Sequence, residues 1–96
     1  MSHNAHDPIF AQGTLTIPAT GVLLGTDTGL EYIDSFVVSI VGGTAALANS
    51  TVSVTWTLES DNKHVDLYAW AAGGGPAFPL VASTTATTVR YIAIGH

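Results

Sequence analysis

The hydrophobic and polar positions of residues 51–58 alternate without a break, in the order Thr-Val-Ser-Val-Thr-Trp-Thr-Leu. Successive side chains of a strand point to opposite faces, so this order gathers the apolar side chains on one face and the hydroxyl-bearing ones on the other. The pattern predicts a half-buried antiparallel strand. Its buried face is expected to hold Val52, Val54, Trp56 and Leu58.

Shorter alternating segments recur along the chain, separated by glycine, proline and polar turn residues such as those of Glu59–Lys63. No segment has helical periodicity over a useful length. These features predict an all-β fold, an antiparallel two-sheet β-sandwich of jelly-roll-like form. The strands are expected at residues 14–17, 22–24, 32–41, 51–58, 64–71, 79–82 and 87–94.

The segment before the first expected strand differs from the rest of the chain. It is polar, carries two histidines and Pro8, and has Ile9 and Phe10 as its strong hydrophobes. We expect an extended N-terminal arm over residues 1–12, free to pair with the sheet edge of a neighbouring molecule by strand addition. A single β-sandwich domain over residues 13–96 is expected to follow.

The strand expected at residues 32–41 is apolar on both faces, which indicates that the core covers one face and a partner covers the other. Its first face is formed by Phe36, Val38 and Ile40, and its second face by Ile33, Val37 and Val41. For the closing strand the alternation places Val89, Tyr91 and Ala93 opposite Arg90, Ile92 and Ile94.

Tyr68 and Trp70 are the aromatic residues of the strand expected at residues 64–71. If Val65 and Leu67 face the core, the two rings project from the opposite face. Tyrosine and tryptophan on an outward face commonly mark an interface. Two alternatives stay open: the register is reversed and both rings belong to the core, or the rings stack on a sugar.

The composition leaves little polar cover for the surface. Only 9% of the residues are charged and 47% are hydrophobic, whereas an ordinary soluble domain has about 25% charged residues. A small domain has a high ratio of surface to volume, and thirteen threonines and seven serines supply only part of the polar surface it needs. We therefore expect a homo-oligomer, with Ile9, Phe10, Tyr68, Trp70 and Arg90 as interface residues.

The net charge is −5, and Lys63 and Arg90 are the cationic residues. Binding to nucleic acid or to an anionic membrane requires several cations, so neither is expected as a partner. The N-terminal sequence lacks the basic start and apolar run of a signal peptide, and no segment approaches the ~20 apolar residues of a membrane span. The chain has no cysteine, which excludes disulfides and thiolate metal sites. Synthesis in the cytoplasm is expected.

Arg90 is the one arginine and lies in the middle of the closing strand. In a chain so poor in charge, we expect this side chain to form an ion pair with a carboxylate of another subunit. Asp34 and Asp66 are the candidates for that carboxylate. The alternative is a solvent-facing arginine on the strand surface.

Residues suited to catalysis are few. His64 and Asp66 share one strand face, and we interpret them as a solvated pair beside a turn rather than as part of a Ser-His-acid triad. Two carboxylate pairs flank expected turns, where exposed carboxylates are the ordinary case, and they do not predict a glycosidase cleft. These pairs are Glu31 with Asp34 and Glu59 with Asp61. No catalytic residue is expected, and the chain is not expected to be an enzyme.

Metal and cofactor binding are not expected either. His3 and His6 have the spacing of metal ligands only on a helix, which the nearby Pro8 argues against. The run Asp61–His64 offers oxygen atoms but lacks the spacing and the terminal glutamate of a calcium loop.

Three short motifs along the chain are Thr28-Gly29-Leu30, Tyr68-Ala69-Trp70 and Tyr91-Ile92-Ala93-Ile94-Gly95. Together they resemble small β-sandwich structural proteins of tailed bacteriophage particles, over most of residues 13–95. The resemblance implies a capsid decoration (cement) protein, a homotrimer that bridges major capsid subunits and stabilises the phage head. It implies a virion location and the major capsid protein as partner. A tail or fibre component is the alternative.

The closing strand also resembles that of H-type lectins, which are oligomeric β-sandwiches that bind N-acetylgalactosamine. The chain departs from that family at Tyr91, where the family has tryptophan, and the sugar-contacting residues have no counterpart that can be placed in this sequence. Carbohydrate is therefore kept as a secondary alternative to a protein partner.

Overall fold

The computed structural model of the chain describes residues 8–41, 51–72 and 80–96. Within these ranges the regular structure consists of strands, and no helix is present, which confirms the all-β expectation. The strands are β1 (Ile9–Ile17), β2 (Val22–Asp27), β3 (Ile33–Ile40), β4 (Thr51–Leu58), β5 (His64–Ala72), β6 (Leu80–Ala82) and β7 (Thr87–Gly95). A helix able to cross a membrane is likewise not found among the described residues.

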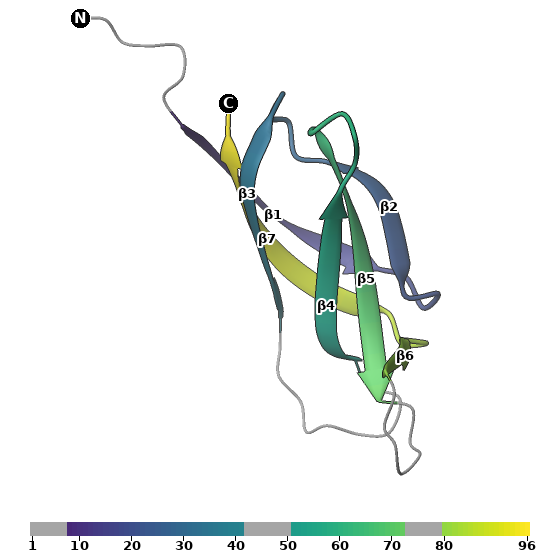
Figure 1. Cartoon of the computed structure of the whole chain (residues 1–96). Coiled ribbons are helices and arrows are strands. Elements are labelled where there is room, and N and C mark those ends of the chain that lie inside the picture. The colour runs from purple at the N-terminus through teal and green to yellow at the C-terminus, as the bar shows by residue number, and fades with distance from the viewer. Residues whose placement is uncertain (1–7, 42–50, 73–79) are drawn as a thin grey trace, which may run out of the picture.

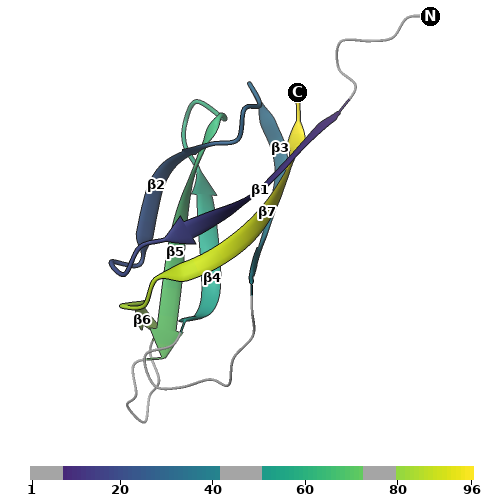
Figure 2. The ribbon, with the colours of Figure 1, turned by 180° about the vertical axis from the view of Figure 1, so that it is seen from behind.

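The strands form two sheets that pack face to face (Figure 1). Sheet A has the order β1-β7-β3, and sheet B has the order β2-β5-β4, with β6 paired to the end of β5. Figure 2 shows sheet A in front of sheet B. All of these pairings are antiparallel, and the chain crosses between the sheets after β1, β2, β3 and β6. The expected two-sheet sandwich of jelly-roll-like form is confirmed.

The core lies between the central strands β5 and β7, whose buried positions alternate with more exposed ones. The buried positions, none more than 8% exposed, include Val65, Leu67 and Ala69 of β5 and Val89, Tyr91 and Ala93 of β7. Phe36 of β3 stacks on Tyr91 with ring centroids 5.5 Å apart, and meets the edge of Trp56 in the other sheet at 5.2 Å. Apolar burial at about 25 cal/mol per Å² makes this layer the main stabilising contact. The faces expected for β5 and β7 are confirmed.

A bulge in β3 changes one expected face. The register of β3 with β7 shifts between Ile33 and Ser35, so Asp34 is an extra residue in the ladder. Ile33 and Phe36 are consequently buried on the same side of the strand, although they are three residues apart. The expectation that Ile33 shares the outer face with Val37 is wrong for this reason.

A second bulge, in β4, turns Thr51 inward and leaves Val52 45% exposed, so the expected burial of Val52 is wrong. The Thr51 hydroxyl lies 2.7 Å from Ser83 Oγ and 2.5 Å from Thr87 Oγ1. Ser83 and Thr87 are buried, and both donate to the carbonyl oxygen of Thr85. Buried hydroxyl groups need such partners. These bonds therefore link β4 to the segment that enters β7.

Strand β1 begins at Ile9 rather than near Gly13. Residues 9–12, which the sequence pattern assigns to the arm, pair with residues 92–95 of β7 in the same chain. The remaining expectations for the arm, for the small-residue loop and for the glycine-rich segment fall on residues 1–7, 42–50 and 73–79, which lie outside the described residues.

Two glycines of sheet A allow close contacts. A Cβ atom on Gly13 would come within 2.9 Å of the Tyr91 ring, which lies opposite it in the β1–β7 ladder. A Cβ atom on Gly95 would overlap the carbonyl oxygen of Tyr32. That approach is held by two hydrogen bonds, in which the N–H groups of Tyr32 and His96 each donate to the carbonyl oxygen of the other. The glycine that ends the Tyr91–Gly95 motif is therefore a packing requirement.

The substitution Gly95→Ala is expected to lower the free energy of unfolding by about 3 kcal/mol or more, because the new Cβ has to displace backbone. Gly29→Ala is the matched control. A Cβ atom on Gly29 would meet nothing within 4 Å, but the φ of +89° strains a larger residue, which costs about 1–2 kcal/mol. Urea unfolding followed by tryptophan fluorescence measures both losses. Equal losses would contradict the close approach of β7 to Tyr32.

Candidate functional site

The outer surface of sheet A, which we call the A face, carries a group of apolar side chains. They are Phe10 of β1, Val37 of β3, and Ile92 and Ile94 of β7. Phe10 pairs with Ile94 and Val37 pairs with Ile92, so all four share one surface. Phe10 is 67% exposed, Val37 58% and Ile92 41%. An exposed apolar group with a polar rim marks an interaction surface.

Arg90 lies toward the other end of the A face, paired with Thr14 of β1 and with Ser39 of β3. Together with Thr14, Gln12 and Gly13 it lines a shallow hollow on this surface. The outward ladder positions of the three described strands of sheet A hold no carboxylate. In a chain with a net charge of −5, the A face is therefore neutral at one end and positive at the other.

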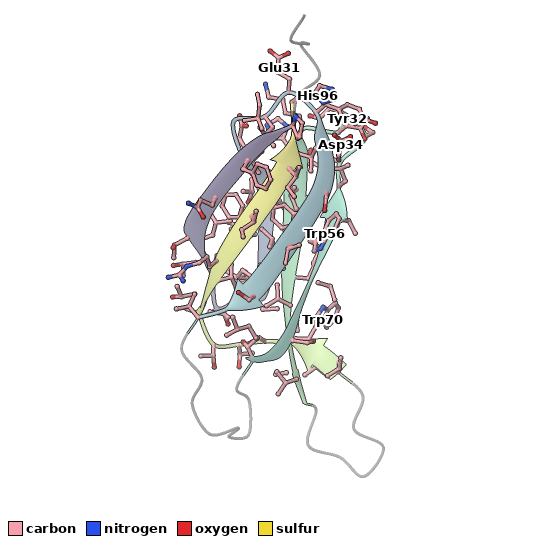
Figure 3. The ribbon with its side chains drawn as sticks, turned by 90° about the vertical axis from the view of Figure 1, so that its left-hand side faces the viewer. Glu31, Tyr32, Asp34, Trp56, Trp70 and His96 are labelled. Carbon is pink, nitrogen blue, oxygen red and sulfur yellow. The ribbon has the colours of Figure 1, made fainter. Side chains whose placement is uncertain are left out.

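The apolar end of the A face adjoins a polar group of Tyr32, Asp34 and His96, labelled in Figure 3. The Tyr32 and His96 rings stack with centroids 5.3 Å apart and planes 11° from parallel. His96 Nδ1 lies 3.6 Å from Asp34 Oδ2, and the Asp34 side chain is 54% exposed. The two ends of the A face therefore differ in charge, with Arg90 at one end and Asp34 beside the other.

The outer surface of sheet B, which we call the B face, is aromatic. Tyr68 and Trp70 project from it half-buried, with ring centroids 6.5 Å apart, while their neighbours Leu67 and Ala69 face the core. Trp70 Nε1 donates to Thr55 Oγ1 at 2.8 Å, which holds the indole against β4. The reversed register, in which both rings would be core residues, is wrong.

The hairpin between β4 and β5 gathers acidic side chains around His64. His64 Nδ1 lies 2.6 Å from Asp61 Oδ2, and its Nε2 lies 3.9 Å from Asp27 Oδ2. The hydrogen bond to Asp61 raises the pKa of His64 above its usual value. The same bond, with the backbone N–H groups of Lys63 and His64 that donate to the carboxylate, lowers the pKa of Asp61 to about 2. The two groups therefore form an ion pair in mildly acidic solution.

Asp66 does not pair with His64, although the two residues share a strand face. Its carboxylate accepts the backbone N–H of Gly25 at 2.9 Å and shares a hydrogen bond with Glu59, which raises the pKa of Glu59. One ligand atom each of Glu59, Asp61 and His64 lies within 4.8 Å of the others. Such donors suit a divalent cation. His64 and Asp61 already neutralise each other, however, and we assign no metal to this group.

The residues expected at an interface do not share one surface. Phe10 and Arg90 lie on the A face, and Tyr68 and Trp70 lie on the B face. Ile9 is 54% exposed at the start of β1, but its ladder position belongs to the inner side of sheet A. Their contact with a partner stays a prediction.

Val37, Ile92 and Ile94 were not among the expected interface residues, although the sequence holds a signal for them. Both β3 and β7 are apolar on two faces, and this feature alone predicts that a partner covers one of them. The sequence does not show that β1, β7 and β3 lie side by side. Only that order brings Phe10 next to Ile94, and Val37 next to Ile92.

No family model, curated protein or solved structure matches the chain. The similarity to phage structural proteins stays a prediction from the three short motifs, and the similarity to H-type lectins stays a prediction from the closing strand.

Asp61→Asn is expected to lower the pKa of His64, because it removes the carboxylate whose hydrogen bond raises that pKa. NMR titration of the imidazole protons measures the change. Asp34→Asn removes a carboxylate of similar exposure near His96 and is expected to leave the His64 titration in place. An unchanged His64 titration in Asp61→Asn would refute the hydrogen bond.

The same pair gives a defined dependence of stability on pH. The raised pKa of His64 stabilises the fold below its usual value of 6.5, and this contribution is lost as the pH rises through the folded value. The lowered pKa of Asp61 stabilises the fold above its usual value of 3.8, and this contribution is lost as the pH falls through about 2. Asp61→Asn should therefore lose most stability between pH 3.8 and 6.5.

Proposed function

We propose that this chain is a structural protein of a bacteriophage particle, a capsid decoration protein that binds the assembled head and bridges major capsid subunits. The observation that supports this most is the presence of apolar or aromatic side chains on both outer faces of the sandwich. They are the exposed Phe10, Val37 and Ile92 on the A face and the half-buried Tyr68 and Trp70 on the B face. A protein that joins two bodies needs two separate surfaces, and the sheets supply them on opposite sides.

The scarcity of charge supports the same proposal. Charged residues are depleted in the centre of protein interfaces, and 9% of this chain is charged. Many of the other outward positions carry hydroxyl groups, such as Thr14 and Thr88 on the A face and Thr55 on the B face. A hydroxyl group can bond to a partner without the large desolvation cost of a charge.

Such a protein acts by binding alone. A ligand that binds the assembled shell and not its separated subunits stabilises the shell by mass action. Each 100 Å² of apolar surface buried against the shell contributes about 2.5 kcal/mol before the cost of association. Because a shell repeats its contacts many times, modest contacts of this size raise the temperature that the whole particle survives.

The same two faces suit a tail or fibre component, for which the only difference is the body that is bound. A carbohydrate-binding module of the H-type-lectin kind is the second candidate, and the B face favours it. Asp66, Tyr68 and Trp70 follow one another along its central strand, which offers a carboxylate and two rings to a sugar. Tyr91, at the position of the lectin tryptophan, is instead 8% exposed and stacked on Phe36.

The test uses empty heads assembled from the major capsid protein of the proposed particle. The purified chain is expected to co-sediment with the heads and to raise the temperature at which they burst. It is expected to pass through an N-acetylgalactosamine column without retention. Retention on the column would replace the proposal with the lectin alternative. Binding to purified tails, and not to heads, would replace it with the tail alternative.

A matched pair of variants locates the contact. Tyr68→Lys places a charge on the B face and is expected to reduce binding to the heads, because the charge must be desolvated there. Ser60→Lys adds the same charge at the exposed tip of the hairpin and is expected to bind normally. Equal binding of both variants would contradict the role of the B face.

A further inference from the structure

We infer that two copies of this chain associate through their A faces, in a two-fold arrangement that brings Arg90 of each copy close to the partner's Asp34. The apolar group of Phe10, Val37, Ile92 and Ile94 forms the contact. This inference goes beyond the proposed function and shares with it only the expectation, drawn from the composition, that the chain forms a homo-oligomer. It is tested without any shell, so it can fail while the particle proposal holds.

The distribution of charge favours a second copy of the chain as the molecule that binds the A face. Two molecules that each carry a net charge of −5 repel one another, and the repulsion is smallest where no carboxylates face each other. Four described carboxylates belong to sheet B or its hairpin, namely Asp27, Glu59, Asp61 and Asp66, and two lie beside the apolar end of the A face, namely Glu31 and Asp34. The outward ladder positions of sheet A hold none, so two copies can meet there.

The order of residues along β7 fixes the orientation of the second copy. Arg90, Ile92 and Ile94 follow one another on the A face at intervals of about 6.6 Å. Consider a two-fold axis that lies between the two stacked sheets and crosses β7 at a right angle near Ile92. This axis packs the apolar centre on itself and, because it reverses the direction of the partner's β7, places Arg90 above the partner's Ile94. The partner's Asp34 lies beside that Ile94, in the neighbouring strand β3, about 4.8 Å to the side. A two-fold axis parallel to β7 would instead place Arg90 above the partner's Arg90, and the repulsion between the two charges disfavours that arrangement.

The size of the A face indicates a reversible contact. Three strands of nine residues or fewer cover a flat area of about 14 by 30 Å, or roughly 400 Å² on each copy, and projecting side chains enlarge the accessible area. Two such faces give about 800 Å² of flat area, so the total buried area lies at or below the lower end of the ~1,200–2,000 Å² of specific interfaces. We expect a dissociation constant on the order of micromolar.

The symmetry of the contact predicts a dimer and not a trimer. A surface that packs on itself closes after two copies, whereas a trimer requires two different surfaces to meet. The inferred contact therefore gives a dimer, in place of the homotrimer that the phage resemblance implies. It leaves the B face of each copy free, on opposite sides of the dimer.

Sedimentation equilibrium of the full chain across the micromolar range tests the inference. The chain is expected to pass from monomer to dimer, and Ile92→Lys is expected to raise the dissociation constant at least about tenfold, because two lysines then meet at the centre. Leu24→Lys is the matched control, since Leu24 is 64% exposed on β2 of sheet B, and it is expected to dimerise normally. Thermal melting confirms that both variants fold.

A charge exchange tests the orientation. Arg90→Glu and Asp34→Arg are each expected to weaken the dimer, because each brings like charges together. The double variant re-forms the pair with its signs reversed and is expected to restore the affinity. Failure of the double variant to restore it would overturn the Arg90–Asp34 placement. A chain that stays monomeric, a trimeric mass, or normal dimerisation of Ile92→Lys would overturn the inference as a whole.

Discussion

Strand β7 has to serve two surfaces at once, because a strand in a sandwich presents alternate side chains to the core and to the outside. Its inward residues Val89, Tyr91 and Ala93 close the core, with the Tyr91 ring between Gly13 and Phe36. Its outward residues include Ile92 and Ile94, which no described part of the chain covers completely. Because β7 lies between β1 and β3, the inward and outward positions of both neighbours line up with those of β7 across sheet A.

The remaining features of sheet A follow from this central strand. Small residues allow its neighbours to approach, since Gly13 makes room for the Tyr91 ring and Gly95 for the backbone of Tyr32. The bulge at Asp34 shifts the register of β3 against β7, and beyond the bulge Val37 is paired with Ile92. The same bulge leaves the Asp34 carboxylate at the end of the sheet, away from the apolar centre of the A face.

The two outer faces differ in the chemistry they offer. The A face has Phe10, aliphatic side chains and Arg90, while the B face has Tyr68 and Trp70, and Trp70 is held by a hydrogen bond to Thr55 within the sheet. Four of the six described carboxylates belong to sheet B or its hairpin, where His64 offsets part of their charge. A chain with few charges thus keeps its carboxylates off the broad surface of sheet A, which suits the contact proposed for that surface.

Alternation along the chain was sufficient to determine the all-β class, the two-sheet sandwich and the inward residues of β5 and β7, because the side-chain period of a strand is a local property. The two-sided apolar character of the β3 segment also predicted from the sequence that a partner covers its outer face. Only the tertiary structure decided which strands are neighbours, and so which exposed residues form one surface. The bulges at Asp34 and Val52, the early start of β1, and the pairing of His64 with Asp61 rather than Asp66 depend on contacts between strands and turns. Such contacts are set by the register of neighbouring segments, which a single strand's pattern does not contain.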